Sequence, residues 1–416
     1  MNSQISNESE KKRLIKMVQE GVIQKHRGLF LDPDSPKSLD RQEEVIRLEV
    51  RSLLGREDPE TENYVIDQLI GYKDLGPFFR DPEVTDILIN GPDQVYIEKN
   101  NRPIRTDIKF GSSEEVMKVL QMAVQKANRK IDYNSPLVDV RLPDGSRMNA
   151  VIVPNCPFPA ISIRKFVRKS FSGEDLVAQG FLNGEMLVFF RYAVRAGCNM
   201  VISGATGCGK TTFLRFLCSF IPGDERIVTI EDTFELNLTG HVVPLQSSRQ
   251  MDVGSLMVNA LRMYPRRVML GEFRGPETFE LLQAIGTGHM GSMTTGHANN
   301  ARHDLVQRLI RAMIRSGMSD EELMRHIVST IDLTVFIKKY RDGTWCVTEV
   351  NEVTDNKGRP GFMEIYRFNR ITGRHEAVNS LSPALLERLQ DELGDEKLPD
   401  IKPFSGLNKP RGVVVV

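Results

Sequence analysis

Neither sign of charge is in excess in this sequence, and tryptophan and tyrosine are scarce. Across 416 residues, 55 lysines and arginines balance 55 aspartates and glutamates, and there are 1 tryptophan and 8 tyrosines. A protein that moves along nucleic acid usually has a basic groove with aromatic side chains for base stacking. The composition provides no global field that would attract nucleic acid or an anionic bilayer, so we expect no nucleic-acid partner.

Long hydrophobic runs are also missing. The most apolar stretch extends from about Met186 to Ser203, but Arg191, Arg195 and Asn199 interrupt it. A membrane-spanning helix needs about 20 predominantly apolar residues. The N-terminal sequence MNSQISNESEKKRL has no apolar segment behind its basic residues, unlike a signal peptide. We therefore expect no membrane span and a cytoplasmic location.

No pair of cysteines has the C-x-x-C spacing, which argues against a zinc ribbon and against a disulfide framework. The cysteines are expected to be reduced thiols, and they are Cys156, Cys198, Cys208, Cys218 and Cys346. With 40% hydrophobic and 26% charged residues, the composition is that of a folded globular protein. The length allows two or three domains.

The residue pattern changes along the chain, which indicates separate domains. Charged helical patterns come first, followed by short alternating strands and an amphipathic helix behind the capping pair Ser112 and Glu115. Later, apolar strands alternate with helices, as in a mostly parallel sheet covered on both faces. The predicted parts are a helical segment (1–75), an α+β domain (76–168), a linker (169–173), an α/β nucleotide-binding domain (174–380) and a mobile acidic tail (381–416).

The strongest motif is a phosphate-binding loop between a predicted strand and a predicted helix. The segment GATGCGKT fits the pattern G-x-x-x-x-G-K-[ST], in which backbone N–H groups and the helix dipole hold phosphate. Lys210 is expected to reach the β and γ phosphates and Thr211 to hold Mg²⁺, whereas the Cys208 thiol is expected to take no chemical part. The predicted nucleotide-binding residues are Gly204, Ala205, Thr206, Gly207, Cys208, Gly209, Lys210, Thr211 and Thr212.

Carboxylates follow two of the predicted strands. The apolar run VML brings Glu272 to the carboxyl edge of the sheet, where ligands bind, as a Walker B candidate that contacts metal through water. The segment RIVTIEDTFEL ends another strand with Glu231, Asp232 and Glu235. Close carboxylates repel one another unless a divalent cation or a cationic partner lies among them; the alternative is a solvated surface cluster. We predict an Mg²⁺ site formed by Thr211, Glu231, Asp232 and Glu272.

Two histidines, His289 and His297, flank the predicted strand SMTTGHA. They lack the nearby carboxylate triad of many metal sites, and as core histidines they would need partners on an apolar face. We interpret them as loop-borne sensors of the phosphate.

In order and spacing, four segments resemble the motifs of the type II/IV secretion superfamily ATPases: GATGCGKT, TIEDTFEL, LGEFRGPE and TGHMGSMTTGHAN. The earlier segments LGPFFRDPEVTDILINGPDQVYIE, RLPDGSRMNAVIVP and AISIRKF resemble the N-terminal domain of the Tad/Flp pilus assembly ATPases. The resemblance covers about residues 66–355. It implies a RecA-like P-loop NTPase domain, preceded by an α+β N-terminal domain and a helical N-terminal segment.

The resemblance also implies catalytic roles for individual residues. Glu235 would polarise the attacking water, Glu231 and Asp232 would organise metal and loop, and Glu272 would take the Walker B role.

His289 and His297 match the family's histidine box, which links the γ-phosphate to the subunit interface. Gly296 stands where the family usually has a larger aliphatic residue, so we expect this glycine to loosen its strand. Arg147 and Arg164 resemble N-terminal-domain arginines that reach the nucleotide, although an arginine on a hairpin is more often a solvated surface charge. A run of basic residues with no acid around Arg164 favours contact with phosphate.

The family forms homohexameric rings that hydrolyse ATP with Mg²⁺ and act with a polytopic inner-membrane platform protein. The resemblance therefore implies a peripheral location on the inner face of the cytoplasmic membrane. The chain lacks the metal-binding cysteine module of type II secretion and pilus-extension relatives, which favours the Tad pilus or conjugation branches. A RecA-like nucleic-acid motor and a non-hydrolysing nucleotide switch are the alternatives from other classes; the neutral composition argues against the first and the dense carboxylates against the second.

Overall fold

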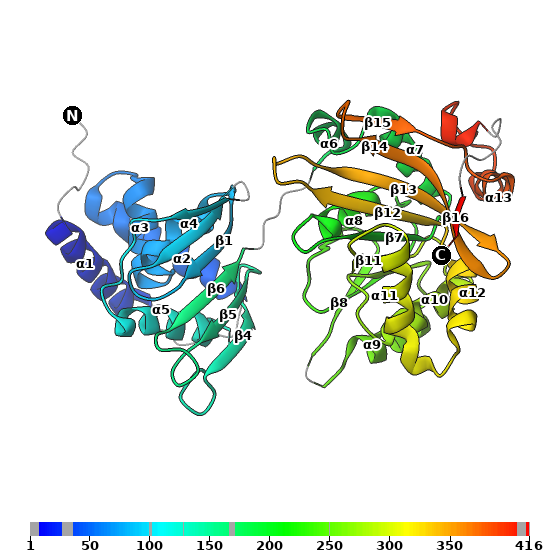
Figure 1. Cartoon of the computed structure of the whole chain (residues 1–416). Coiled ribbons are helices and arrows are strands. Elements are labelled where there is room, and N and C mark those ends of the chain that lie inside the picture. The colour runs from blue at the N-terminus through cyan, green and yellow to red at the C-terminus, as the bar shows by residue number, and fades with distance from the viewer. Residues whose placement is uncertain are drawn as a thin grey trace. The chain divides into compact units, whose positions relative to one another are not determined.

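The computed structural model describes residues 8–26, 36–99, 102–127, 129–165, 171–248, 250–405 and 413–415. The chain forms two compact units, Met1–Lys169 and Ser170–Val416, and Figure 1 shows the elements of each.

Helices come first in the first unit, in the segment that the sequence pattern predicts to be helical. Apolar residues at helical spacing, among them Val18, Ile46, Val50 and Val65, form a small separate core. The helices are α1 (Glu8–His26), α2 (Pro36–Leu54), α3 (Pro59–Leu69) and α4 (Gly76–Arg80), with a 3-10 turn at Lys73–Leu75.

An antiparallel six-stranded sheet in the order β3-β2-β1-β6-β5-β4 completes the first unit. Ser112 caps α5 (Ser113–Lys126) by accepting the N–H of Glu115 at 3.3 Å, and α5 packs its apolar side chains into the core on one face of the sheet. Residues that alternate with core positions along the strands, including Arg147 and Arg164, are exposed. The strands are β1 (Val84–Ile89), β2 (Val95–Lys99), β3 (Arg102–Arg105), β4 (Leu137–Arg141), β5 (Arg147–Val151) and β6 (Ala160–Arg164).

The second unit is built on a 10-stranded sheet in the order β15-β14-β13-β12-β7-β11-β10-β8-β9, with β16 beside β14. Strands from β12 to β9 in that order are parallel, and those from β12 to β15 are antiparallel. The parallel strands are β7 (Met200–Gly204), β8 (Ile227–Glu231), β9 (Val242–Gln246), β10 (Arg267–Leu270), β11 (Met293–His297) and β12 (Leu333–Lys339). The others are β13 (Trp345–Asn356), β14 (Arg359–Asn369), β15 (Arg374–Ala377) and β16 (Val413–Val415).

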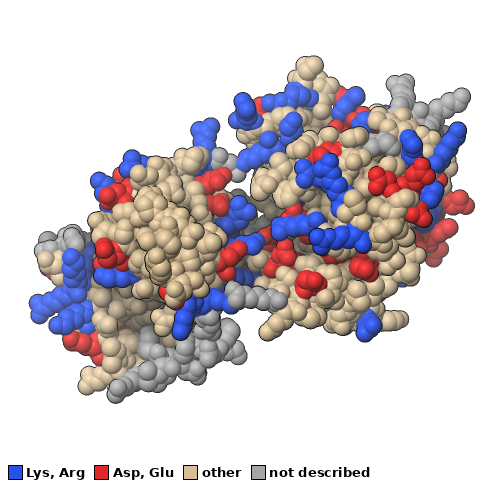
Figure 2. Space-filling view, turned by 60° about the horizontal axis from the view of Figure 1, so that its bottom comes forward, with Lys and Arg blue, Asp and Glu red and all other residues tan. Residues whose placement is uncertain are grey.

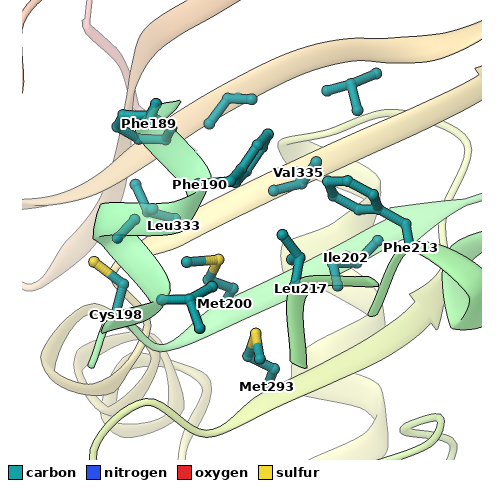
Figure 3. Packing of buried hydrophobic residues seen from close by; sticks show 14 of the residues in the cluster. Phe189, Phe190, Cys198, Met200, Ile202, Phe213, Leu217, Met293, Leu333 and Val335 are labelled. Carbon is teal, nitrogen blue, oxygen red and sulfur yellow. The ribbon is translucent and has the colours of Figure 1, made fainter. Parts of the chain in front are cut away.

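Apolar cores cover both faces of this sheet. On β7, Ile202 belongs to one core and Val201 to the other, because successive side chains point to opposite faces. Figure 3 shows the first core, where Phe189 and Phe190 of α7 and Phe213 of α8 lie over β7 and β12. This two-sided burial explains why central parallel strands such as β7 and β10 are buried along their whole length and carry apolar side chains on both faces. The helices are α6 (Gly173–Ala178), α7 (Gly184–Arg195), α8 (Lys210–Cys218), α9 (Val253–Ala260), α10 (Glu277–Gly286), α11 (His303–Met313), α12 (Asp320–Thr330) and α13 (Pro383–Leu393).

The boundary between the two units, after Lys169, falls within the predicted linker (169–173), and the structure corrects only the end of that linker and the predicted tail. Residues 166–170 lie outside the described residues, but Phe171 packs on Trp345 and α6 begins at Gly173, so the end of the predicted linker is part of the second unit. The predicted mobile tail is wrong for residues 381–405. Helix α13 buries Leu385 and Leu389 against the first core, because these two residues lie one helical turn apart while the acidic residues face water.

Among the described residues, no helix is both long and apolar enough to cross a membrane. The five cysteines are free thiols, as predicted, and all but Cys156 are buried. On the face shown in Figure 2, basic and acidic side chains are interspersed over the second unit.

Candidate active site

The phosphate-binding loop joins the carboxyl end of β7 to the first turn of α8. Gly209 is the N-cap residue of α8 and has φ of +84°, a left-handed conformation that favours glycine. No side chain caps this helix, so its first N–H groups are left for a ligand. The geometry is that of an anion-binding helix terminus.

Lys210 is the first residue of α8 and is only 7% exposed. Its Nζ donates to the carbonyl oxygens of Gly204 at 3.3 Å and Ala205 at 3.0 Å, and lies 3.2 Å from Nδ1 of His297. Burial lowers the pKa of Lys210, and the carboxylates of Glu272 and Glu235 oppose that shift. The ammonium is therefore folded onto the loop, facing acids that come from two other strands.

Glu272 follows the fully buried strand β10 and lies among cations. Its Oε2 accepts a hydrogen bond from Nη2 of Arg274 at 2.7 Å, and its Oε1 lies 2.8 Å from Nε2 of His297. The Oε1 atom is buried, and the short distance to His297 lacks hydrogen-bond geometry, so this oxygen has no donor among the described residues. An acceptor is thus held at the sheet edge without a fixed partner.

His297 ends β11 and pairs in register with Gly204, which brings it to the phosphate-binding loop. Its Nδ1 also lies 3.5 Å from Oγ1 of Thr206. Burial and the neighbouring Lys210 charge lower the pKa of His297, which favours a neutral imidazole between the loop and Glu272. The prediction that His297 lies at the phosphate site agrees with this geometry.

His289 lies elsewhere. It precedes β11 and therefore belongs to the amino edge of the sheet, where its Nδ1 contacts the carbonyl of Ala284 in the last turn of α10 at 3.0 Å. The strands are parallel, so this edge is opposite the one that holds Lys210. Within one subunit, the prediction that His289 senses phosphate is wrong.

Glu231 ends β8 and is buried, with Oε2 accepting the backbone N–H groups of Glu235 at 2.7 Å and Leu236 at 2.9 Å. Burial raises the pKa of Glu231, and those two donors oppose the shift. The prediction that Glu231 holds metal is not supported, because the carboxylate is committed to the backbone of the next loop. Its role as an organiser of that loop fits, since it fixes the position from which the exposed Glu235 emerges.

Arg274 is the residue that sequence reasoning missed. Its Nη1 donates to Oδ2 of Asp232 at 3.0 Å while its Nη2 donates to Glu272, so one guanidinium bridges the acidic segment and the Walker B strand. Asp232 also accepts from Ser247 at 3.2 Å. The cationic partner that the close carboxylates require is thus an arginine. No group of three or more potential metal-ligating side chains forms among the residues with described placement, so the predicted acidic metal cluster is not observed.

Arg147 and Arg164 belong to the first unit, where they lie directly opposite each other on β5 and β6. Arg147 is 3.3 Å from Asp139 and Arg164 is 3.3 Å from Asp86, and their side chains remain 45% and 66% exposed. Like charges directly opposite each other on neighbouring strands repel, so a bound anion would stabilise this pair.

Cys208 is buried among the side chains of the first core, and burial raises the pKa of its thiol. The thiol is therefore not activated, as expected.

Comparison with known proteins identifies the family of this chain. The sequence model of the family described as type II/IV secretion system protein matches residues 73–359. The chain belongs to this family.

Two relatives align over most of this chain. A putative conjugal transfer protein of Mycobacterium tuberculosis is 28% identical over 318 residues, which cover 73% of this chain and 90% of the relative. The type IV secretion system protein PtlH of Bordetella pertussis is 30% identical over 320 residues, covering 69% and 94%. The ATPase DotB of Yersinia pseudotuberculosis superposes with a TM-score of 0.51 at 17% identity, covering 69% and 79%, and this likeness shows the fold.

The predicted α/β, RecA-like fold class is confirmed, and the chain is an ATP hydrolase of the secretion family.

At Gly296, where the resemblance implies a larger aliphatic residue, the structure shows what fills the space. A Cβ at Gly296 would lie 2.0 Å from Cε1 of Phe273, so the phenyl ring fills the space that a larger residue would take. Strand β11 keeps its pairing with β7 through this position. The expectation that Gly296 loosens the strand is wrong, because Phe273 packs against it from the segment between Glu272 and Arg274.

We predict that Gly296→Ala lowers the free energy of unfolding by about 1–3 kcal/mol, the usual cost of overpacking a core. Phe273→Leu in the same chain should recover part of the loss. Urea unfolding measures both, with Gly286→Ala as the control, because a Cβ there would meet its nearest atom at 3.8 Å. Equal stability of the two alanine variants would contradict this packing.

Proposed function

We propose that the chain hydrolyses ATP to drive assembly of a Tad/Flp type IV pilus or a related secretion machine. One observation carries the hydrolysis: Lys210, His297, Glu272, Arg274 and Asp232 form an unbroken series of close polar contacts from the phosphate-binding loop to the acidic segment. Such a series supports the proposal, because it would surround a bound γ-phosphate with acid, base and cation.

Different residues would bind the phosphates, accept the proton and sense the γ-phosphate. The N–H groups of residues 204–212 and the Lys210 ammonium would bind the phosphates. Glu235 would accept a proton from the attacking water, and its position is set by the two backbone hydrogen bonds to Glu231. His297 would report the presence of the γ-phosphate to Glu272.

Mg²⁺ is the cation that this chemistry uses, and two residues suit it. The Thr211 hydroxyl in the first turn of α8 would hold it directly, and Glu272 would hold it through water. The buried Oε1 of Glu272 has no other hydrogen-bond donor among the described residues, so it fits the role of acceptor for metal-bound water. When bound, Mg²⁺ would neutralise charge on the β and γ phosphates.

A second candidate for the machine that the enzyme drives is a conjugation or type IV secretion system. The relatives are named a putative conjugal transfer protein and a type IV secretion system protein, so this alternative fits as well as the pilus. In either case we propose that the enzyme works at the inner face of the cytoplasmic membrane with a polytopic platform protein. A nucleic-acid motor is disfavoured by the balanced charge.

We predict that Glu235→Gln binds ATP but hydrolyses it about 10²-fold or more slowly, the range for a lost general base. Lys210→Ala should weaken nucleotide binding as well as turnover, because it removes the positive charge from the loop. Calorimetry with ATP and a phosphate-release assay separate the two effects.

Chelation of divalent cations should stop wild-type turnover, and added DNA should not stimulate it. A Glu235→Gln variant with wild-type turnover would remove this residue from the mechanism.

A closed homohexameric ring is the proposed active form. Head-to-tail contacts close into rings when the rotation between neighbours allows it. Native mass measurement with a non-hydrolysable ATP analogue should give six copies. A fully active monomer at micromolar concentration argues against the ring.

Arg147 and Arg164 are proposed to contact the bound phosphates from the N-terminal domain. Arg164→Ala should then reduce turnover more than folding stability, with a lost charge-assisted contact worth about 1.5–3 kcal/mol. Lysine should rescue poorly, because it lacks the planar fork. The matched control is Arg102→Ala, an exposed arginine on β3 of the same sheet. If Arg164→Ala turns over ATP like this control, Arg164 is only a surface charge.

A further inference from the structure

The single tryptophan of the chain lies against the phosphate-binding loop. Trp345 is the first residue of β13, and its indole Nε1 donates to the carbonyl oxygen of Cys208 at 2.7 Å. The same ring covers Gly209, where a Cβ would lie 2.8 Å from Cζ2 of the indole. None of the nucleotide-binding motifs includes Trp345.

This hydrogen bond has a consequence for the next amide. The peptide bond between Cys208 and Gly209 is trans, so the Cys208 carbonyl and the Gly209 N–H point in opposite directions across one plane. By holding the carbonyl on its own side, the indole directs the Gly209 N–H away from itself. Without that bond, rotation of this peptide would turn a carbonyl dipole toward a bound anion and remove a donor from it.

The hairpin that carries Trp345 is itself fixed. The backbone N–H of Tyr340 donates to Thr344 at 2.7 Å, and Arg370 hydrogen-bonds to Oγ1 of Thr344 at 3.2 Å. The guanidinium of Arg370 also lies 4.0 Å from the centre of the Tyr340 ring and is paired with Asp342. A rigid support of this kind is what a positioning residue requires.

Two further aromatic rings pack on the indole. Phe181 lies 4.2 Å from it between ring centres and is fully buried, while Phe171 lies 5.8 Å away. Phe171 is the first described residue after the boundary between the two units. The segment through which the chain enters the second unit therefore touches the residue that touches the phosphate-binding loop.

We propose that Trp345 is a positioning residue for nucleotide binding: it orients the Gly209 N–H into the phosphate cradle and couples the cradle to the chain entering the second unit at Phe171. The inference rests on the proposed function of the loop. It adds a residue from the antiparallel part of the sheet to a site otherwise built from its parallel part.

The test is Trp345→Phe in the full chain, which keeps an aromatic ring beside Phe181 and removes the N–H donor together with part of the indole ring system. The Kd for ATP, measured by calorimetry, and the KM should both rise about three- to tenfold, as expected for one hydrogen bond, with kcat near the wild-type value. Tyr366→Phe is the matched control, because it removes a hydrogen bond of 3.1 Å to Glu185 in the same core. That variant should lose thermal stability and keep the wild-type Kd.

Phe171→Leu tests the coupling. It should change the fluorescence of Trp345, the sole tryptophan, and raise the Kd for ATP. Titration of the wild type with nucleotide should also change this fluorescence. A Trp345→Phe variant with the wild-type Kd overturns the positioning role, and a Phe171→Leu variant with unchanged emission and Kd overturns the coupling. Both outcomes leave the proposed function intact if the wild type binds and hydrolyses ATP. A wild-type chain that does not bind ATP removes the proposed function instead.

Discussion

Charge balance at the carboxyl edge of one parallel sheet is the constraint on which this site depends. The fold brings Lys210, His297, Glu272, Asp232 and Arg274 to that edge from different strands and loops. Isolated, the charges of the buried Lys210 and of Glu272 would be costly, but in the series Glu272 lies beside Arg274 and Lys210 lies beside two backbone carbonyls and a neutral imidazole. In the proposed function, an incoming phosphate and its cation would exchange places with parts of this series. The same interactions that stabilise the free site therefore prepare it for a highly charged ligand.

Backbone hydrogen bonds add a second level of organisation. The carboxylate of Glu231 accepts hydrogen bonds from the N–H groups of Glu235 and Leu236, and Lys210 donates to carbonyls of its own loop. Both residues hold a loop in the shape that presents another group. A carboxylate near a proposed metal site can thus act through the chain that it orders, without contacting the metal.

The hairpin of β12 and β13, where the parallel part of the sheet meets the antiparallel part, also shapes the phosphate-binding loop. A Cβ at Gly204 would lie 2.4 Å from the carbonyl oxygen of Ile337 on β12, and the indole of Trp345 covers Gly209 from the start of β13. The phosphate-binding loop is therefore packed against the β12–β13 hairpin at both ends. Its glycines are required by these close approaches as well as by the phosphate.

The sequence alone determined the fold class, the phosphate-binding loop and the strand that carries Glu272, because each depends on local spacing or on a long apolar run that only a doubly covered strand needs. It also predicted His297 at the site, through a resemblance in motif order. It could not distinguish His297 from His289. Both histidines follow a Thr-Gly pair, but they lie at opposite edges of the sheet. Nor could it predict that Arg274 pairs with two carboxylates or that Glu231 accepts hydrogen bonds from its own loop. The packing of Phe273 on Gly296 and the hydrogen bond from Trp345 to Cys208, 137 residues away in sequence, were equally beyond it. These pairings join residues that no local pattern relates, and only the order of strands in the folded sheet decides which of them meet.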